Sequence, residues 1–392
     1  MAEKNLDFDT VINRKNTKSL KYDFAVQRGK PKGVLPMWVA DMDFKTSSYV
    51  IDALTQASLH GIYGYSEPEE EYFEAVKNWM KKRHKWDVEE EWLVKTPGVV
   101  FALAMAVRAY TKEGDAVLIQ QPVYYPFREV VVKNGRKLVK NELKQAANGK
   151  YEIDFEDFEE KIVNENVKLF ILCSPHNPVG RVWRKEELTK LGDICLKHGV
   201  IVVSDEIHSD FVFQGEHTVF TNVKREYEEN SIVCTSPSKS FNIAGLQVSN
   251  VFIANQKLRK KFLEQLEATG YSQLNLAGIT ACEAAYRYGE EWMDALLSYI
   301  KANAEYAKAF IEEKLPKVKV TELEGTYLMW LDFRAYGLSE KELSDRMIHK
   351  ANLWLDRGGI FGKCGLGFQR INIACPRSIL TTALEQMEKA FK

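Results

Sequence analysis

The sequence predicts an α/β protein, with a mostly parallel central sheet in a large domain and a smaller α+β domain. Short apolar runs of strand length alternate with segments of helical periodicity through the middle of the chain. Near residue 326 this rhythm changes to a strand, a helix, another strand and a last helix. The alternation indicates strand–helix–strand units, and the change indicates a second domain.

The large domain shows its strands most clearly as apolar runs at residues 116–121, 168–173, 200–205, 231–235 and 248–254. Between the second and the third of these runs, Leu188, Leu191, Cys195 and His198 recur at helical spacing, and Gly199 follows them. Glycine commonly follows the last turn of a helix, because it adopts the left-handed conformation without strain. We therefore expect one strand–helix–strand unit here.

The small domain is expected from the strand at 326–333 onward. Ser339 and Glu342 form a capping-box pattern that starts a helix, and a last helix begins at about Ser378. No repeat or glycine–serine linker separates the parts, so the domains should be tightly joined. We expect residues 46–290 to form the large domain, and residues 1–45 together with 291–392 to form the small one.

The overall charge gives no reason to expect nucleic acid or a membrane as a partner. Lys and Arg number 54 against 55 Asp and Glu, and the formal net charge is −1. The six cysteines lie far apart without a C-x-x-C pair, so neither a metal site nor a disulfide framework is indicated. The polar start lacks an apolar targeting core. We expect a soluble cytoplasmic protein that acts on a small molecule.

Polar side chains follow the predicted strands where a parallel sheet would place its ligand. Ligands of open α/β sheets bind at the carboxyl ends of the strands. Taken singly, a lysine is usually solvated surface and an aspartate after a strand is usually a turn or a helix cap. The residues that follow the strands in order are Tyr124, Asn177, Asp205 with His208, and Ser236 with Ser238 and Lys239. Together they predict one crevice.

Pyridoxal phosphate (PLP) gives this set a chemical logic. Lys239 would form a Schiff base with the aldehyde, and Asp205 would pair with the protonated pyridine nitrogen, which keeps the ring an electron sink. Asn177 could donate to the ring hydroxyl, and Tyr124 offers a flat face for stacking. His208 is expected either beside Asp205 or in plain packing.

The phosphate needs donors of its own. The stretch 96–107 places Gly98, Val99 and Val100 at the start of a helix, where free N–H groups and the helix dipole suit an anion. Ser236 and Ser238 would add hydroxyl groups from the other side. These residues complete the expected cofactor site.

At these residues the chain resembles fold-type I PLP enzymes, the aminotransferase class I/II superfamily. The blocks "LPMWVADMDF", "SPHNPVGRVW", "SDEIHSDF", "SPSKSFNIAG" and "FQRINIACPRS" are similar to the MalY/PatB subgroup of cystathionine β-lyase-like enzymes. The resemblance implies that Lys239 is the catalytic lysine and that Arg370 binds the substrate carboxylate. It also implies a homodimer, in which Tyr65 reaches the phosphate of the neighbouring subunit.

One departure from the superfamily concerns the phosphate. Many of these aminotransferases carry an arginine eight residues after the lysine, and this chain has Gln247 there. We therefore leave Gln247 out of the predicted site. The glycine-rich stretch 358–368 does not follow a strand and open a helix, so it is interpreted as a mobile loop over the substrate and not as a nucleotide site.

Three functions stay open from the sequence. The first is a carbon–sulfur β-lyase that acts on cystathionine or related cysteine thioethers. The second is an aminotransferase on the same scaffold. The third is a PLP-bearing protein whose main role is to bind a regulatory partner. Release of pyruvate without a keto-acid acceptor separates the first from the second, and the sequence does not rank the possible thioethers.

Overall fold

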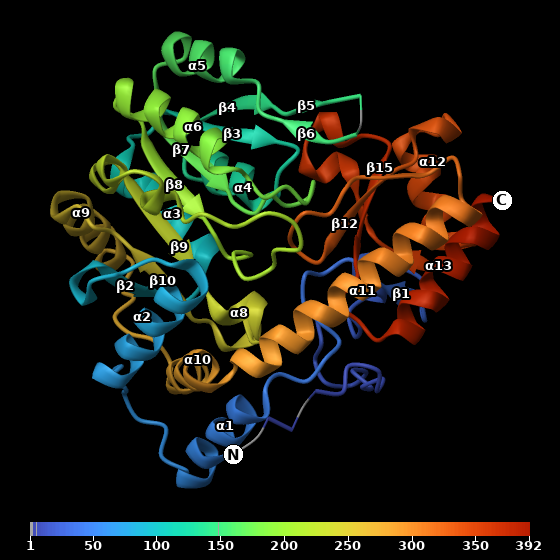
Figure 1. Cartoon of the computed structure of the whole chain (residues 1–392), viewed down its shortest axis with the longest axis horizontal. Coiled ribbons are helices and arrows are strands. Elements are labelled where there is room, and N and C mark those ends of the chain that lie inside the picture. The colour runs from blue at the N-terminus through green and yellow to red at the C-terminus, as the bar shows by residue number, and fades with distance from the viewer. Residues whose placement is uncertain (1–2, 5, 148) are drawn as a thin grey trace.

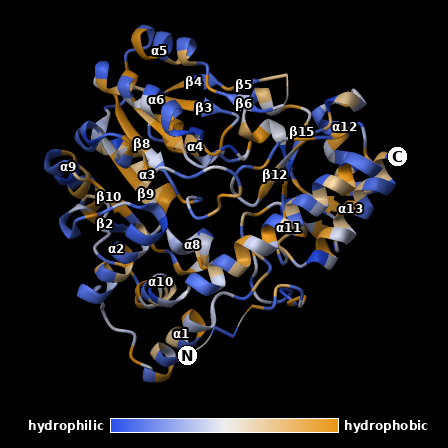
Figure 2. Cartoon of the chain, viewed as in Figure 1, coloured by the Kyte–Doolittle hydropathy of each residue, from blue (hydrophilic) through white to orange (hydrophobic). Residues whose placement is uncertain are grey.

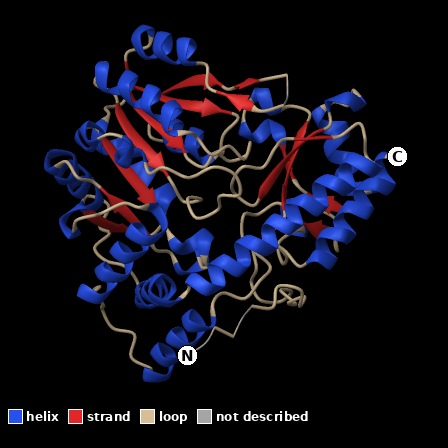
Figure 3. Ribbon diagram, viewed as in Figure 1, coloured by secondary structure: helices blue, strands red, loops and turns tan. Residues whose placement is uncertain are grey.

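The computed structural model describes residues 3–4, 6–147 and 149–392. Within them, a seven-stranded sheet has the order β2-β10-β9-β8-β7-β3-β4. Its strands are β2 (Leu93–Thr96), β3 (Ala116–Gln121), β4 (Lys137–Glu142), β7 (Val167–Cys173), β8 (Ile201–Asp205), β9 (Ser231–Thr235) and β10 (Ser249–Phe252). β10 runs antiparallel to both of its neighbours, β2 and β9, and the other pairs of this sheet are parallel. The predicted α/β class with a mostly parallel sheet is confirmed (Figures 1 and 3).

The predicted strands agree closely with those observed, and two edge strands were missed. β3 and β9 have the predicted bounds, and β7 starts one residue earlier than predicted. The missed strands are β2 and β4. β4 lies at the sheet edge and carries the exposed charged side chains of Lys137, Lys140 and Glu142, so it lacks the apolar run of a central strand.

Helices cover both faces of this sheet (Figures 1 and 3). The helices in this part of the chain are α1 (Ser48–His60), α2 (Glu70–His84), α3 (Val99–Tyr110), α4 (Pro126–Lys133), α5 (Phe155–Asn164), α6 (Lys185–Lys197), α7 (Phe220–Val223), α8 (Pro237–Ser240), α9 (Gln256–Glu267) and α10 (Leu276–Tyr288). Successive side chains of a strand point to opposite faces. Phe170 and Leu172 accordingly pack with α5 and α6, while Leu169 and Ile171 pack with α3 and α9.

Burial on both faces explains why the central strands appear in the sequence as continuous apolar runs. Figure 2 shows strands β8 and β9 as largely hydrophobic, with hydrophilic residues on the outer helix α9. Every residue of β3 and β9 is buried. A strand that is covered on both faces has no polar side, so the sheet places its functional groups beyond the strand ends.

The C-terminal part contains a separate four-stranded sheet, of order β11-β12-β15-β14. Its strands are β11 (Lys319–Val320), β12 (Leu328–Asp332), β14 (Asp356–Arg357) and β15 (Phe368–Asn372). Its helices are α11 (Glu290–Lys314), α12 (Glu340–Asp345) and α13 (Arg377–Phe391). The capping box predicted at Ser339 and Glu342 is present at the start of α12. β5 (Lys144–Gln145) and β6 (Tyr151–Glu152) form a small hairpin elsewhere.

The N-terminal segment returns to the C-terminal part of the chain. β1 (Leu35–Pro36) pairs in parallel with β13 (Leu353–Trp354). Trp38 then stacks on Trp354, with ring centroids 4.4 Å apart. The division into domains at 46–290 and 1–45 with 291–392 stays a prediction, but this pairing brings residues 35–44 into reach of the large sheet.

Two further predictions concern the glycine-rich stretch and the membrane. Residues 358–361 and 363–365 form two 3₁₀ turns, and the Phe361 carbonyl accepts a hydrogen bond from the Val123 N–H at 3.0 Å. The stretch therefore packs beside the end of β3. Among the described residues, no helix is both long and apolar enough to cross a bilayer.

Candidate active site

A cavity of about 460 Å³ lies at the carboxyl ends of the central strands. The chain enters it from the ends of β7, β8 and β9 and from the start of α3, as the topology of a parallel sheet requires. The predicted residues among its walls are Gly98, Val99, Val100, Tyr124, Asn177, Asp205, His208, Ser238 and Lys239. The structure thus brings most of the predicted cofactor residues together around one space.

Lys239 occupies the short helix α8, directly after β9. The Ser236 hydroxyl caps this helix by accepting a hydrogen bond from the Ser238 N–H at 3.0 Å. The Lys239 Nζ donates to the Ala40 carbonyl at 2.5 Å. Burial lowers the pKa of Lys239 to about 8, with Arg370 acting in the same direction and Asp41 and Asp205 opposing it. Its amine is therefore much closer to neutral at pH 7–8 than an exposed lysine.

Asp205 is the last residue of β8 and is 5% exposed. Its Oδ1 accepts a hydrogen bond from the Ile207 N–H at 3.1 Å, and no ion pair to it is found within the described part of the chain. Burial raises the pKa of Asp205 to about 7, which the Ile207 N–H and Lys239 oppose. A buried carboxylate without an ion pair is suited to receive a cationic ligand atom.

Asn177 and Arg370 form one connected unit beside the cavity. Arg370 is 2% exposed, and its Nη1 donates to the Asn177 Oδ1 at 3.0 Å. Its Nη2 donates to the Trp38 carbonyl at 2.8 Å and pairs with Asp356. The Arg370 Nε is buried and has no partner in the described structure. These contacts use three of the five guanidinium N–H groups, and Arg370 itself lies outside the cavity walls.

Tyr124 and His208 contribute rings to the walls. The Tyr124 N–H donates to the Asn177 carbonyl at 3.1 Å, and burial raises the pKa of its phenol, so Tyr124 stays neutral. His208 packs edge-on against Tyr327, with centroids 5.6 Å apart. Burial, helped by Lys239 and Arg370, lowers the pKa of His208 well below its usual value. His208 makes no hydrogen bond to Asp205 within the described structure, so packing is the role that the geometry supports.

The start of α3 lines the cavity. α3 begins at Val99 with Gly98 as its N-cap residue, and the walls here include Ser238. The first N–H groups of a helix have no partner within the helix and carry a partial positive charge. A phosphate at this point would meet donors that need no positively charged side chain.

Two sequence predictions about this end need correction. Ser236 was expected to offer its hydroxyl to the phosphate, but it lies outside the cavity walls and donates to the Val248 carbonyl at 2.6 Å. The structure gives it the role of a helix cap. Gln247 was left out of the site because it is not an arginine, yet it lines the cavity. Its amide can donate a neutral hydrogen bond in the same place.

The sequence did not predict several other residues of the site. Ala40 acts through its carbonyl, which no side-chain pattern reveals. Asp356 reaches Arg370 across the pairing of β14 and β15, a contact between residues of different strands. Cys173 and Phe101 line the cavity as parts of a strand end and a helix that were predicted for other reasons. Tyr65 lies apart from the cavity walls and is 99% exposed, so its predicted contact with another subunit stays a prediction.

The residues present fit PLP. Lys239 offers a reactive amine, Asp205 a buried carboxylate without an ion pair, and α3 a helix N-terminus for the phosphate. A positively charged pyridine nitrogen would be the cationic partner that Asp205 lacks within the described structure. Tyr124 and Asn177 border the same space, where an aromatic ring and a hydroxyl group could be held.

The raised pKa of Asp205 makes a prediction for the cofactor-free protein. The unfolded chain releases this proton near pH 3.8, whereas the folded protein holds it until about pH 7. Between these values the unfolded state binds fewer protons, so the stability decreases as the pH rises. Asp205→Asn should remove this loss, which is on the order of 4 kcal/mol at pH 8 because each unit of pKa difference corresponds to about 1.4 kcal/mol.

Thermal unfolding of both cofactor-free proteins from pH 5 to pH 8 measures the effect. The melting temperature of Asp205→Asn should exceed that of the wild type by an amount that widens up to pH 7 and then levels off. A difference that stays constant with pH would show that Asp205 has an ordinary pKa.

Comparisons with known proteins agree with this geometry. Cystathionine beta-lyase PatB of Bacillus subtilis (strain 168) is 46% identical over 386 residues, which cover 98% of this chain and 100% of PatB. Protein MalY of Escherichia coli (strain K12) is 32% identical and covers 98% of this chain and 99% of its own. The crystal structure of cystalysin from Treponema denticola, which contains PLP, matches with a TM-score of 0.94 and 43% identity, over 98% of each chain.

The match to a family model extends over nearly the whole chain. The model is described as Aminotransferase class I and II, and it matches residues 33–387. This range includes both sheets and every wall of the cavity. The chain belongs to the aminotransferase class I and II family.

Proposed function

We propose that this protein is a PLP-dependent carbon–sulfur β-lyase, which converts cystathionine or a related cysteine thioether and water to a thiol, pyruvate and ammonia. The observation that carries the proposal is the Lys239 amine, whose pKa is lowered to about 8, in one cavity with the buried Asp205 and beside Arg370. The similarity to PatB, which is named a cystathionine β-lyase and matches over its full length, supports the choice of reaction.

The proposed cofactor site uses the cavity walls as a set. Lys239 would bind the aldehyde carbon and Asp205 the ring nitrogen, while Asn177 and Tyr124 would hold the ring. The start of α3 at Gly98, Val99 and Val100, with Ser238 and Gln247, would hold the phosphate. When bound, PLP supplies a carbonyl carbon for the substrate nitrogen and a ring that accepts the electron pair of the broken C–H bond.

Lys239 is the proposed general base. With the cofactor and a substrate bound, the Lys239 amine would take the α-proton of the substrate. An amine with a pKa near 8 is partly neutral at physiological pH and can accept a proton. The Ala40 carbonyl, 2.5 Å from Nζ, can hold the resulting ammonium group by a hydrogen bond. Asp205 would be ionised beside a positively charged ring nitrogen and would stabilise the protonated form of that nitrogen.

Arg370 is the proposed carboxylate-binding residue. Asn177, Asp356 and the Trp38 carbonyl fix its guanidinium plane and leave Nε without a protein partner. A fixed planar donor orients a carboxylate, which a lysine at this position would not do. Asp356 also balances the arginine charge, so the residue can stay buried before a substrate arrives.

A homodimer is part of the same proposal. Leu59, Ile62, Tyr63 and Tyr65 expose 74%, 67%, 69% and 99% of their surface along one short stretch of chain. Monomers rarely expose several large apolar side chains together, so a second copy is the occupant we propose, with Tyr65 reaching its phosphate site. Light scattering of the purified protein tests the dimer.

The reaction type is tested by the fate of two amino acids. The wild type should release pyruvate from cystathionine with no keto acid present, and none from alanine, because alanine has no leaving group on its β-carbon. A lactate dehydrogenase coupled assay measures both. If steady turnover of cystathionine needed an added keto acid, the protein would be an aminotransferase and the β-lyase proposal would be wrong.

Arg370→Lys tests the carboxylate contact. We expect kcat/KM to fall by a similar factor, on the order of 10²-fold, for every thioether substrate, because the α-carboxylate is common to all of them. Steady-state kinetics with cystathionine and with an S-alkyl cysteine give the two factors. A loss confined to one substrate would place Arg370 at the variable side chain instead.

A further inference from the structure

The segment 38–44 is held beside Lys239 in part through its backbone carbonyls. Asn372 Nδ2 donates to the Val39 and Asp41 carbonyls, each at 2.6 Å. Tyr327 and Lys239 both donate to the Ala40 carbonyl, at 2.9 and 2.5 Å. These donors come from distant parts of the chain, so the position of the segment depends on side chains outside it.

Asn242 fixes the segment on the side of the lysine loop. Its Oδ1 accepts a hydrogen bond from the Met42 N–H at 2.9 Å, and its Nδ2 donates to the Met42 and Phe44 carbonyls at 3.0 and 2.9 Å. Asn242 lies three residues after Lys239 in the sequence. The segment is thus tied to the loop that carries the catalytic amine.

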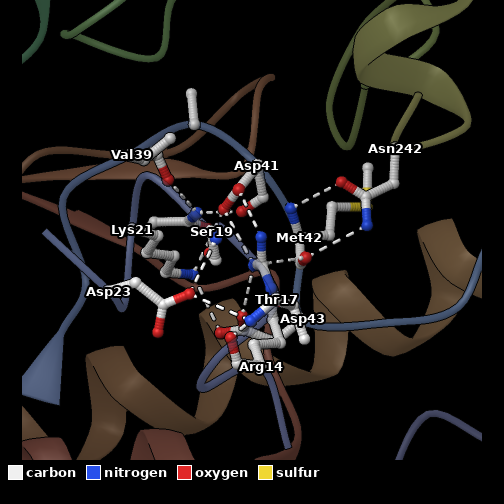
Figure 4. A network of polar contacts seen from close by, with 12 residues as sticks. Arg14, Thr17, Ser19, Lys21, Asp23, Val39, Asp41, Met42, Asp43 and Asn242 are labelled. Atoms are coloured by element: carbon white, nitrogen blue, oxygen red, sulfur yellow. Dashed lines mark hydrogen bonds and ion pairs between the residues drawn. The ribbon is translucent and has the colours of Figure 1, made fainter. Parts of the chain in front are cut away.

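A cluster of four charges fixes the other side (Figure 4). Arg14 pairs with Asp41 and with Asp43, each at 2.7 Å, and its Nη1 donates to the Met42 carbonyl at 3.1 Å. Lys21 pairs with Asp43 at 2.8 Å and lies 3.6 Å from Asp41. Two cations from the N-terminal segment therefore meet two carboxylates from segment 38–44.

The cluster is too deeply buried to be an ordinary surface pairing. The side chains of Lys21 and Asp43 are both 1% exposed, and that of Arg14 is 21% exposed. Removing one partner of such a pair leaves an uncompensated buried charge, which costs far more than a surface pair contributes. The cluster contains two positive and two negative side chains, so its buried charges are balanced within it.

We propose that Arg14 is a positioning residue of the active centre: by holding Asp41, Asp43 and the Met42 carbonyl, it fixes the Asp41 carboxylate and the Ala40 carbonyl relative to the Lys239 amine. This inference rests on the proposed function, in which that amine is the base. Arg14 touches neither Lys239 nor the cavity wall, so it acts through segment 38–44 alone.

The charges around Lys239 explain why this position matters. The charged groups that act on its pKa are Asp41 in segment 38–44, Asp205 at the end of β8 and Arg370 in β15. The neutral side chains of His208 and Tyr327 complete its surroundings. Asp41 and the Ala40 carbonyl both favour the protonated amine, and both belong to the segment that Arg14 holds. Loss of the Arg14 contacts to this segment should therefore lower the pKa of Lys239.

The test measures the pKa of Lys239 in the cofactor-free protein, where no turnover is needed. Competitive acylation with acetic anhydride across pH 6–10, followed by peptide mass spectrometry, gives the titration of this one amine. Asp41→Asn should lower the pKa by on the order of one unit, because it removes a nearby negative charge. Arg14→Gln should lower it in the same direction, because Asp41 is no longer held.

The double variant and two single controls make the test specific. Arg14→Gln combined with Asp41→Asn should lower the pKa by less than the sum of the two single shifts, since both changes act in part through Asp41. Arg14→Lys keeps the charge but cannot make the forked contacts, so it should give an intermediate shift. Arg259→Gln should leave the pKa unchanged, although Arg259 also donates to two carbonyls, Ile253 and Ala254, and pairs with Glu91.

Two outcomes would overturn the inference. A raised pKa in Arg14→Gln would mean that the arginine acts by its own charge and not by position. An unchanged pKa in Arg14→Gln and Arg14→Lys, both folded by circular dichroism, would leave Arg14 only a structural role. Neither outcome depends on the reaction: absence of pyruvate from cystathionine would remove the proposed function and leave the titration result intact.

Discussion

The withdrawal of two ionisable groups from water at one edge of a parallel sheet is the constraint on which the rest of the structure depends. Burial moves the pKa of Asp205 up to about 7 and that of Lys239 down to about 8, so each group is held near the point where its charge is lost. A positively charged ring nitrogen would restore the ionised carboxylate, and an aldehyde would consume the neutral amine. The same desolvation therefore prepares both groups for one cofactor.

The polar contacts around the cavity keep these groups in place by neutralising charge locally. Arg370 is balanced by Asp356, and the Asp41 and Asp43 carboxylates are balanced by Arg14 and Lys21. Each of these sets of ion pairs includes a segment from another part of the chain, which it holds at the carboxyl edge of the large sheet. The N-terminal and C-terminal segments thus contribute to the site through backbone carbonyls and fixed side chains.

The sequence predicted the features that depend on local pattern. Buried on both faces, β3 and β9 appear as continuous apolar runs with the bounds observed, and their ends point to Tyr124 and Lys239. The edge strand β4 was missed because its buried residues alternate with exposed charged residues. Ala40 and Gln247 could not be assigned, since a backbone carbonyl has no sequence signature and a glutamine has none specific to phosphate. Ser236 was assigned to the phosphate because its role as a helix cap depends on the fold of α8.

The most direct test of the central claim is the covalent attachment of PLP to Lys239. The purified protein is incubated with PLP, reduced with borohydride and digested, and the modified peptide is identified by mass spectrometry. The account predicts one reduced pyridoxyl adduct, on Lys239 of the SPSKSF segment, and none in Lys239→Ala. A wild-type protein that carries no adduct, or carries it on another lysine, would contradict the account.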